Sequence, residues 1–511
     1  MISYIPPKED LFIGRKEELQ LLSQAEKPEK PFIVVVYGRR RIGKTTLLEH
    51  AYEHRNLLKF EGIQTNILKH ARLGSRIKEK DQQYQLNKSL KQLVRYLEFD
   101  QEKKMYENWS VNSWSDFFEL LYELTKDGQW TLFFEEVQWL ASYSPYFFSE
   151  LKECWDNLFR KNPKIGILLS GSSPSFIMNQ IVSDKALYGR ITLQIHLKEF
   201  NFIETEKILG KNRSNFEIMD AILTVGGIPE YLKILKKNNS VFLSLYSNSF
   251  LKNSYFLYEK EKIFTSSMAK SKHYEKILIF LSKKKYATLK QIKSHLKTKA
   301  GSPITDILED LIQCDFIEKY IPLTLSSSSN VLRYCIKDNY LQFYFKFISP
   351  IRKEIEIGNF NETSINAINQ DDFKKWLGFA FERWCRTNYR LFSRILGFQG
   401  IKYKAGSFFN KGILTNKPGF QIDLMFVRSD RIITICEIKY HQDLISASVI
   451  SEVEEKIRVL KNEYSKAKTY TIQKILITTL GGKKSLIERH YFDRIITIEE
   501  IRDILSQRHL H

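Results

Sequence analysis

The chain of 511 residues is too long for one compact core and predicts three or four domains of roughly 100–200 residues each. A hydrophobic content of 43% with only 22 Gly and 12 Pro excludes a disordered or fibrous protein. The 79 Lys and Arg residues outnumber the 59 Asp and Glu residues, and the formal net charge of +20 attracts polyanions. We therefore expect weak, sequence-tolerant DNA binding that falls steeply with salt. The alternative is a lysine-rich protein from an AT-rich genome that is basic without binding DNA.

The amino terminus and the cysteines indicate where the protein works. Residues 1–7 lack a basic region followed by an apolar stretch, and no uninterrupted apolar run approaches the roughly 20 residues that span a bilayer. The five cysteines form no CxxC or CxxH pair, which argues against a disulfide framework and a structural zinc site. These features predict a cytoplasmic protein without membrane insertion.

The first functional motif follows an apolar run at residues 33–37, which is typical of a buried parallel strand. The pattern GxxxxGK[ST] comes directly after it, and a helix is expected next. In such a loop, backbone N–H groups curl around phosphate oxygens, Lys44 bridges the β- and γ-phosphates, and the Thr45 hydroxyl completes a Mg²⁺ shell. The predicted nucleotide-binding residues are Gly38, Arg39, Arg40, Arg41, Ile42, Gly43, Lys44, Thr45 and Thr46.

A second strand, at residues 130–136, is apolar and ends in two acids. In P-loop ATPases the first acid of such a pair holds magnesium through water, and the second polarises the attacking water. Glu135 is therefore the predicted metal residue, and Glu136 is the predicted catalytic residue. Because Glu135 stands where Asp is usual, its extra methylene shifts the carboxylate and predicts slow turnover. The alternative is a buried strand that ends in solvent-exposed acids.

A third apolar strand is expected at residues 165–170, and it ends at Gly171. The small polar side chain of Ser172 follows it and is a candidate sensor of the γ-phosphate from a neighbouring strand. The alternative is a simple turn from strand to loop.

Six segments, taken in order, resemble the archaeal-type ATPase family, an AAA+-like branch of the signal-transducing P-loop ATPases that also occurs in bacteria. They are residues 12–19, 38–46, 135–139, 169–173, 187–190 and 226–232. The resemblance implies a nucleotide-binding αβ core with a helical lid, and it favours ATP as the ligand. It also implies that Arg190 is an arginine finger or sensor and that residues 226–230 form a lid element near the nucleotide. Without the resemblance, Arg190 is a surface arginine after a glycine. Oligomerisation is left open.

The middle of the chain, residues 274–350, predicts short amphipathic helices followed by a β-like pair. Three helices and a hairpin suggest a winged helix, whose third helix enters the major groove in a DNA reader. That helix, at residues 304–311, carries Asp306, Glu309 and Asp310, which phosphates repel, whereas lysines cluster upstream at 283–299. We therefore favour internal docking over base reading, and contact of the lysine-rich elements with a phosphate backbone stays open.

Two strands are expected at residues 420–427 and 432–439. Glu437 and Lys439 are two residues apart and share one face. A three-residue loop at 429–431 would pair residue 428 with residue 432 and place Asp423 opposite Glu437. An Asp and a Glu so placed can hold Mg²⁺, and Lys439 can stabilise a pentavalent phosphate or help to activate water.

This arrangement resembles the PD-(D/E)xK nuclease fold, to which the C-terminal domain that usually accompanies the ATPase family is related. Glu382, on a helix expected from about residue 371, matches the helical acid that often joins such sites. The resemblance implies a metal site formed by Glu382, Asp423 and Glu437, although relatives include inactive versions. The alternative is a pair of strands with solvated, charged ends.

We predict an α/β protein of five segments. They are a P-loop ATPase core at 1–200, a helical lid at 201–265, a winged-helix-like module at 266–350, a linker at 351–370 and a restriction-endonuclease-like domain at 371–511. The predicted function is an ATP-hydrolysing switch or motor joined to a nuclease-like effector, with ATP and Mg²⁺ as cofactors. The rival prediction is a non-hydrolysing regulatory protein that uses ATP as a latch and binds a protein or nucleic-acid partner without cleaving it.

Overall fold

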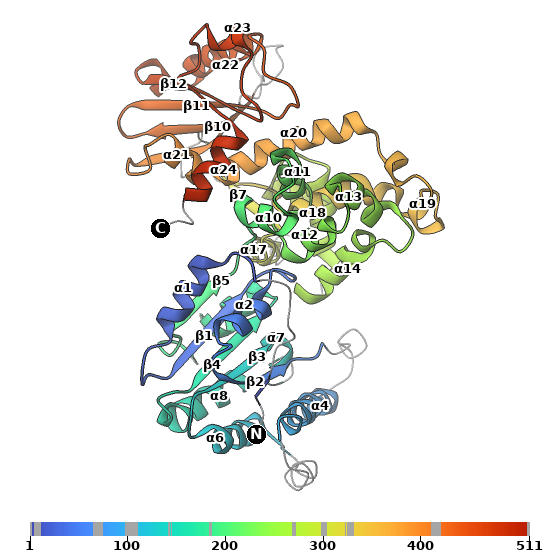
Figure 1. Cartoon of the computed structure of the whole chain (residues 1–511), viewed down its shortest axis with the longest axis vertical. Helices are drawn as coiled ribbons and strands as arrows, with labels where there is room; N and C mark the ends of the chain where they lie inside the picture. Colours follow the sequence, from blue (N-terminus) through green and yellow to red (C-terminus); the bar gives the residue numbers. More distant parts are fainter. Residues whose placement is uncertain are drawn as a thin grey trace. The chain divides into compact units, whose positions relative to one another are not determined.

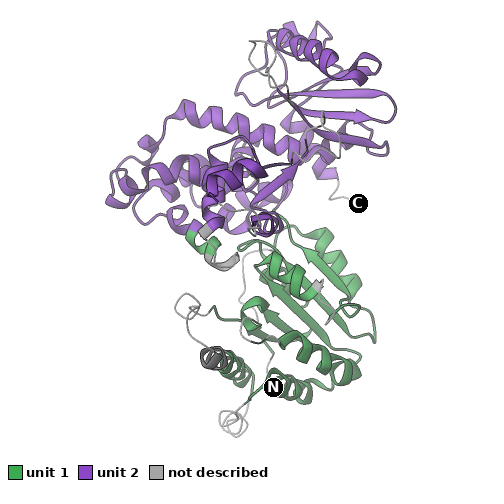
Figure 2. Cartoon of the chain, turned by 180° about the vertical axis from the view of Figure 1, so that it is seen from behind, with its two compact units in different colours: residues 1–199, 261–270 green, residues 200–260, 271–511 purple. Residues whose placement is uncertain are grey.

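The structure of the chain is a computed structural model, which describes residues 3–4, 12–64, 75–97, 111–141, 144, 146–182, 187–267, 272–297, 304–321, 323, 332–409 and 421–507. The chain divides into two compact units (Figure 2). The first comprises residues 1–199 and 261–270, and the second comprises residues 200–260 and 271–511. Across these described ranges, no helix has the length and apolar character that crossing a bilayer requires.

The first unit is built around a five-stranded parallel sheet in the order β2-β3-β4-β1-β5 (Figure 1). Its strands are β1 (Phe32–Tyr37), β2 (Asn56–Glu61), β3 (Trp130–Glu135), β4 (Gly166–Gly171) and β5 (Leu193–His196). β1 is buried along its whole length and pairs in parallel on both sides, which confirms the prediction for residues 33–37. Because parallel strands end at the same edge and β4 lies between β1 and β3, the residues that follow these three strands are neighbours.

Helices complete the first unit. They are α1 (Lys16–Ala25), α2 (Lys44–Ala51), α4 (Ser75–Val94), α6 (Trp114–Thr125), α7 (Val137–Leu140), α8 (Phe147–Asn157) and α9 (Pro174–Ile177). α6 begins with a capping box, in which the Ser113 side chain accepts a hydrogen bond from the Asp116 N–H. Alternate residues of the central strands, among them Val35, Phe134 and Leu169, share one apolar cluster with buried residues of α6 and α8. The sheet is therefore a rigid support for the loops at its carboxyl edge.

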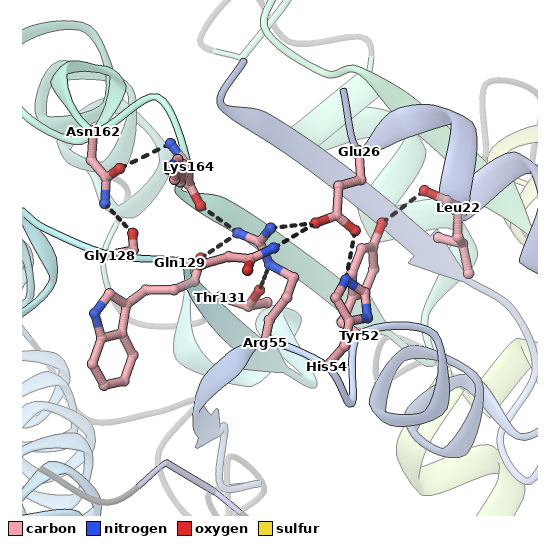
Figure 3. Close-up of polar contacts among 11 residues, drawn as sticks. Leu22, Glu26, Tyr52, His54, Arg55, Gly128, Gln129, Thr131, Asn162 and Lys164 are labelled. Atoms are coloured by element: carbon pink, nitrogen blue, oxygen red, sulfur yellow. Dashed lines mark hydrogen bonds and ion pairs between the residues drawn. The ribbon is translucent and has the colours of Figure 1, made fainter. Parts of the chain in front are cut away.

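Arg55 ties the elements together at the opposite, amino edge of the same sheet (Figure 3). Its guanidinium donates to Thr131 Oγ1 at 2.7 Å and to the Trp130 carbonyl oxygen at 2.8 Å, and it also contacts the Lys164 carbonyl. Glu26, just after α1, pairs with Arg55 at 2.5 Å. Because the Arg55 side chain is only 2% exposed and is paired through all three nitrogens, this network fixes the starts of β3 and β4.

The second unit begins with a helical segment. Its helices are α10 (Phe202–Leu209), α11 (Asn215–Val225), α12 (Pro229–Lys236), α13 (Val241–Phe250) and the first part of α14 (Tyr255–Ser267), whose residues from 261 onward belong to the first unit. A Cβ atom at Gly227, between α11 and α12, would lie 2.0 Å from the Phe200 carbonyl oxygen, so the chain path requires glycine there. Pro229 opens α12, the helical position that proline tolerates best. The Gly-Gly-Ile-Pro segment thus has a local structural role, and its placement near a nucleotide stays a prediction.

The described part of the middle of the second unit contains short helices and a small antiparallel sheet in the order β6-β8-β7. The elements are α15 (Lys272–Ser282), β6 (Ala287–Thr288), α16 (Leu289–Leu296), α17 (Ile304–Gln313), β7 (Ile317–Tyr320), β8 (Arg333–Ile336) and α18 (Asn339–Phe343). The predicted β-like pair is confirmed. Two acids of α17 make internal contacts, because Glu309 pairs with Lys319 at 2.7 Å and Asp310 accepts from the Tyr274 hydroxyl at 2.5 Å.

The segment predicted as a linker, residues 351–370, contains regular structure. It contains helix α19 (Arg352–Ile357), and its last residue starts α20 (Gln370–Thr387). Ile355 of α19 is completely buried, and Arg352 pairs with Glu356 one turn later at 2.8 Å. The segment is largely polar in sequence, but its buried Ile355 anchors it to the rest of the unit.

The C-terminal part of the second unit is a five-stranded mixed sheet in the order β13-β12-β11-β10-β9. After α20 its elements are α21 (Tyr389–Ile395), β9 (Tyr403–Phe409), β10 (Gln421–Arg428), β11 (Ile432–Lys439), α22 (Val449–Glu463), β12 (Thr471–Thr478), α23 (Lys484–Ile487), β13 (Arg494–Ile496) and α24 (Ile498–Gln507). β10 is antiparallel to both β9 and β11, whereas β11, β12 and β13 are parallel. The crossover helix α22 packs its apolar side against the sheet through Val453, Ile457 and Leu460.

Candidate functional site

The phosphate loop lies between the carboxyl end of β1 and the start of α2. Gly38, Arg41 and Gly43 all have positive φ angles, and a Cβ atom at Gly38 would lie 2.6 Å from the Leu197 carbonyl oxygen. The loop curls around Lys44, whose Nζ donates to the carbonyl oxygens of Gly38 at 3.2 Å and Arg39 at 3.3 Å. Burial lowers the pKa of Lys44, although Glu136 and Glu135 partly oppose that shift. The predicted strand, loop and helix are thus present, with the lysine held inside the loop.

The structure brings the predicted metal residues together at the same edge. The Thr45 hydroxyl contacts the Glu135 carboxylate directly. Sequence reasoning missed Lys59 of β2, whose Nζ lies 2.8 Å from Glu135 Oε2 and 2.9 Å from Glu49 Oε1. Burial works to lower the pKa of Lys59, but the two carboxylates outweigh it and raise that pKa, so the lysine is a cation. Glu135 therefore has part of its charge neutralised from the neighbouring strand.

Glu136 follows β3 in a left-handed backbone conformation with a φ of 51°. Its carboxylate accepts hydrogen bonds from the Ser172 hydroxyl at 2.6 Å and from the Ser172 N–H at 3.2 Å. The Gln138 amide also contacts Glu136, and it donates to Ser172 Oγ at 3.1 Å. The predicted catalytic acid and the predicted sensor therefore touch one another, and a change at Ser172 reaches Glu136 directly.

Arg190 and Arg15 of the first unit have different surroundings. Arg190 precedes the amino end of β5 and pairs with Asp156 at 2.8 and 2.7 Å, so it is at the opposite edge of the sheet from Lys44. Buried Arg15 donates to the Ile42 carbonyl oxygen of the phosphate loop at 2.9 Å and to the Lys198 carbonyl oxygen at 2.7 Å. Arg15 stands in the Phe-Ile-Gly-Arg segment of the resemblance, which could have identified it as a support of the loop.

The hairpin of β10 and β11 has the predicted register. Val427 pairs with Ile433 and Leu424 with Cys436, so residues 429–431 form the loop and Asp423 stands opposite Glu437. A bulge between β9 and β10 falls at residues 422–425. Asp423 and Glu437 are 8% and 2% exposed, so both carboxylates are largely withdrawn from solvent.

Glu382 of α20 reaches the same place and shares a hydrogen bond with Asp423. Burial raises the pKa of Glu382 to about 7, and the charge of Asp423 adds to the shift. Asp423 also accepts from the Gln421 amide at 2.6 Å. Two carboxyl groups this close repel one another when both are ionised, and a bound cation would relieve that repulsion.

Two lysines balance the acids of this cluster. Lys439 Nζ lies 3.3 Å from Glu437 and 2.6 Å from Glu452. Lys456 of α22, which sequence reasoning missed, donates to both oxygens of Glu437 at 2.9 and 2.7 Å. Within the described residues, no group of three His, Cys, Asp or Glu side chains is already arranged around a single ion position. In this conformation the Lys456 ammonium occupies both carboxylate oxygens of Glu437, to which a metal ion would otherwise bind.

Tyr440 connects this cluster to the helical segment of the same unit. It follows the Glu-Ile-Lys end of β11, and its hydroxyl donates to Asp220 Oδ1 of α11 at 2.6 Å. Its ring lies 5.0 Å from Phe381 of α20 and 6.3 Å from Phe216 of α11. The end of the candidate catalytic strand is thus bonded to the segment predicted to form the lid.

Asp220→Asn is expected to raise stability above about pH 6. Burial raises the pKa of Asp220 to about 6, and Glu217 adds to the shift while the Tyr440 hydrogen bond opposes it. The unfolded carboxyl titrates near about 3.9, so the native state binds more protons in between and the free energy of unfolding falls by roughly 3 kcal/mol as pH rises through this window. Asparagine keeps an oxygen for Tyr440 but cannot ionise. Urea unfolding at several pH values measures the effect, with Asp443→Asn as the exposed control. Parallel pH profiles for Asp220→Asn and wild type would contradict it.

Two family models match the chain. The family described as an ATPase domain predominantly from Archaea matches residues 12–235, and a family of archaeal and bacterial proteins of unknown function matches residues 344–457. An uncharacterized protein of Methanocaldococcus jannaschii is 29% identical over 375 residues, which cover 73% of this chain and 76% of the relative. An uncharacterized ATP-binding protein of the same organism is 38% identical over 47 residues, which cover 9% of this chain and 80% of that protein.

Solved structures similar to the chain include the Walker-type ATPase of Pyrococcus abyssi. It has 19% sequence identity and a TM-score of 0.46, and the match covers 66% of this chain and 96% of that chain. The ORC2 protein of Aeropyrum pernix, in its ADPNP and ADP complexes, has 15% identity and a TM-score of 0.41, with coverage of 69% and 96%.

Proposed function

We propose that the first unit, most of which lies within the match to the ATPase domain found predominantly in Archaea, binds ATP with Mg²⁺ and hydrolyses it slowly. The observation that carries the proposal is the meeting of Lys44, Thr45, Glu135 and Glu136 at the carboxyl edge of the parallel sheet. Lys44 would exchange the carbonyls of its own loop for phosphate oxygens. Thr45 and Glu135 would hold Mg²⁺, which supplies charge neutralisation at the phosphates.

The slow rate follows from the surroundings of the two acids. Lys59 holds one oxygen of Glu135, which reduces the negative charge that this residue offers to Mg²⁺. Glu136 orients the attacking water and accepts its proton, while Ser172 fixes the carboxylate and reports on the γ-phosphate. Because Arg190 lies at the opposite edge of the sheet, its role as an arginine finger requires the nucleotide site of a second copy of the chain.

Lys44→Ala is expected to weaken ATP binding by about 2–4 kcal/mol, or roughly 30- to 1000-fold in Kd, because it removes the charge that bridges the phosphates. Isothermal titration calorimetry with MgATP measures the change. The exposed residue Lys27 offers a control, since Lys27→Ala removes the same charge away from the loop. An unchanged affinity in Lys44→Ala would sink the assignment of the nucleotide site.

For the second unit we propose a restriction-endonuclease-like domain that cuts phosphodiesters with a divalent cation. The supporting observation is that Asp423 shares a hydrogen bond with Glu382 and stands opposite Glu437, which Lys439 contacts. A cation would displace Lys456 from Glu437, and the freed ammonium would then face the incoming phosphate. Metal-dependent nicking of plasmid DNA tests this proposal.

The remaining segments are proposed to couple the two activities. The helical segment at 201–265 would act as the lid, and the winged-helix-like module would dock within the protein, as its paired acids suggest. The Tyr440–Asp220 hydrogen bond offers a direct route from that lid to the C-terminal strand. The rival proposal is an ATP-dependent latch that binds a protein or nucleic-acid partner without hydrolysing ATP.

A further inference from the structure

A basic cavity of about 460 Å³ lies in the second unit, between the middle module and α20. Seven of its 16 lining residues are Lys or Arg, and two, Asp372 and Glu382, are acidic. The α20 residues among them recur at helical spacing and so share one face of that helix. A cavity of this volume is large enough for one nucleotide-sized ligand, and its charge selects an anion.

Arg383 is the feature that points to a bound anion. Its Nε and Nη2 nitrogens are buried and have no hydrogen-bond partner among the residues that the structure describes, and its guanidinium lies 5.9 Å from the Trp376 ring centroid. The adjacent carboxylate of Glu318 is taken by Arg386 at 3.0 Å. Nε and Nη2 form the guanidinium edge that binds two oxygens of a phosphate, so this costly burial is relieved when a phosphate arrives.

The cavity also has an aromatic side that leads to the candidate metal site. Phe379 is 53% exposed, which is unusual for a phenylalanine, and Lys285 Nζ lies 5.7 Å from its ring centroid. Glu382, one turn further along α20, lines the cavity and also bonds to Asp423. A base can stack on Phe379 while its phosphate binds Arg383, since stacking on an aromatic side chain is independent of sequence.

We propose that this cavity binds one nucleotide unit of a single-stranded nucleic acid, with the phosphate on Arg383 and the base on Phe379. The inference rests on the proposed nuclease-like function and extends it by naming the substrate class. The strand would pass from the cavity along Glu382 to Asp423 and Glu437. The lysines at 283–285 would attract the strand, which gives the lysine cluster upstream of the third helix a function in place of base reading.

Fluorescence anisotropy of a labelled oligothymidylate with the full chain in EDTA tests the proposal. Phe379→Ala is expected to weaken binding roughly 5- to 100-fold, and Arg383→Met at least about tenfold. Arg383→Met is also expected to raise Tm, because it removes a charge whose buried Nε and Nη2 have no hydrogen-bond partner in the described part of the chain. Lys484→Gln, which removes one charge from a residue that is 89% exposed, should stay within about twofold of wild type.

Several results would contradict this proposal. Equal binding by Phe379→Ala and wild type overturns it, and the substitution is not expected to disturb folding because Phe379 is exposed. A lower Tm in Arg383→Met shows that Arg383 serves packing and also overturns it. Displacement by thymidine 5′-monophosphate at equal nucleotide concentration would assign the cavity to a free nucleotide instead of a strand. EDTA prevents metal-dependent cleavage during the binding assay, so binding and cleavage are tested separately. If Phe379→Ala loses binding but the wild type does not cleave in Mn²⁺, only the nuclease proposal fails.

Discussion

Glu136→Gln is expected to reduce steady-state phosphate release from MgATP by about 100-fold or more, while leaving ATP affinity close to that of wild type. Glutamine preserves the size of the side chain and can still accept a hydrogen bond from Ser172, but it cannot take a proton from water. Removal of a positioned general base typically costs roughly 10²–10⁴ in rate. Phosphate release measured with purified protein at saturating MgATP gives the ratio directly.

The control for this experiment is Glu53→Gln, which makes the same chemical change at a side chain that is 62% exposed. It should hydrolyse ATP at the wild-type rate. Equal, background-level release by wild type and Glu136→Gln, with ATP binding intact in both, would favour the latch over the ATPase. We expect Glu135 to limit the wild-type rate, since its carboxylate is shared between Thr45 and Lys59.

The sequence predicted those parts of the candidate sites that are formed by residues close together in the chain. The order of strand, glycine-rich loop and helix around Lys44 is local, so its pattern was sufficient to predict it. The same holds for the β10–β11 hairpin. Side chains alternate between the two faces of a strand, so a loop of three residues places Asp423 and Glu437 on the same face of the sheet. In both cases the geometry is set within about 20 residues of chain.

Other side chains that contact these site residues come from distant parts of the chain, and no local sequence pattern predicts them. Lys59 meets Glu135 only because β2 is the neighbour of β3 in the sheet. Lys456 meets Glu437 because the crossover helix α22 packs against the sheet that contains β11. Tyr440 and Asp220 are 220 residues apart. Each of these contacts depends on tertiary packing, which propensity and periodicity do not determine.

Asp423→Ala is expected to abolish metal-dependent nicking of plasmid DNA, with a loss of roughly a thousandfold or more, and Lys439→Ala should do the same. Asp423 lies between Glu382 and the Gln421 amide and opposite Glu437, so its removal leaves too few carboxylates to hold the cation. Lys439 is held as a cation by Glu452 and Glu437, which raise its pKa against the effect of burial. Its loss removes the charge that would stabilise the pentavalent phosphate.

The assay compares wild type with both variants in Mg²⁺ and in Mn²⁺, with Asp443→Asn as the exposed control and circular dichroism to establish that each variant is folded. Cleavage by wild type and by the control that is lost in both variants would assign catalysis to this cluster, because the two side chains contribute by different chemistry and share only the reacting phosphate. Cleavage that survives in Asp423→Ala would come from another site or a contaminant. If wild type cuts neither DNA nor RNA in either metal, Lys456 stays bonded to Glu437 as a permanent substitute for the cation, and the domain binds its partner without cutting it.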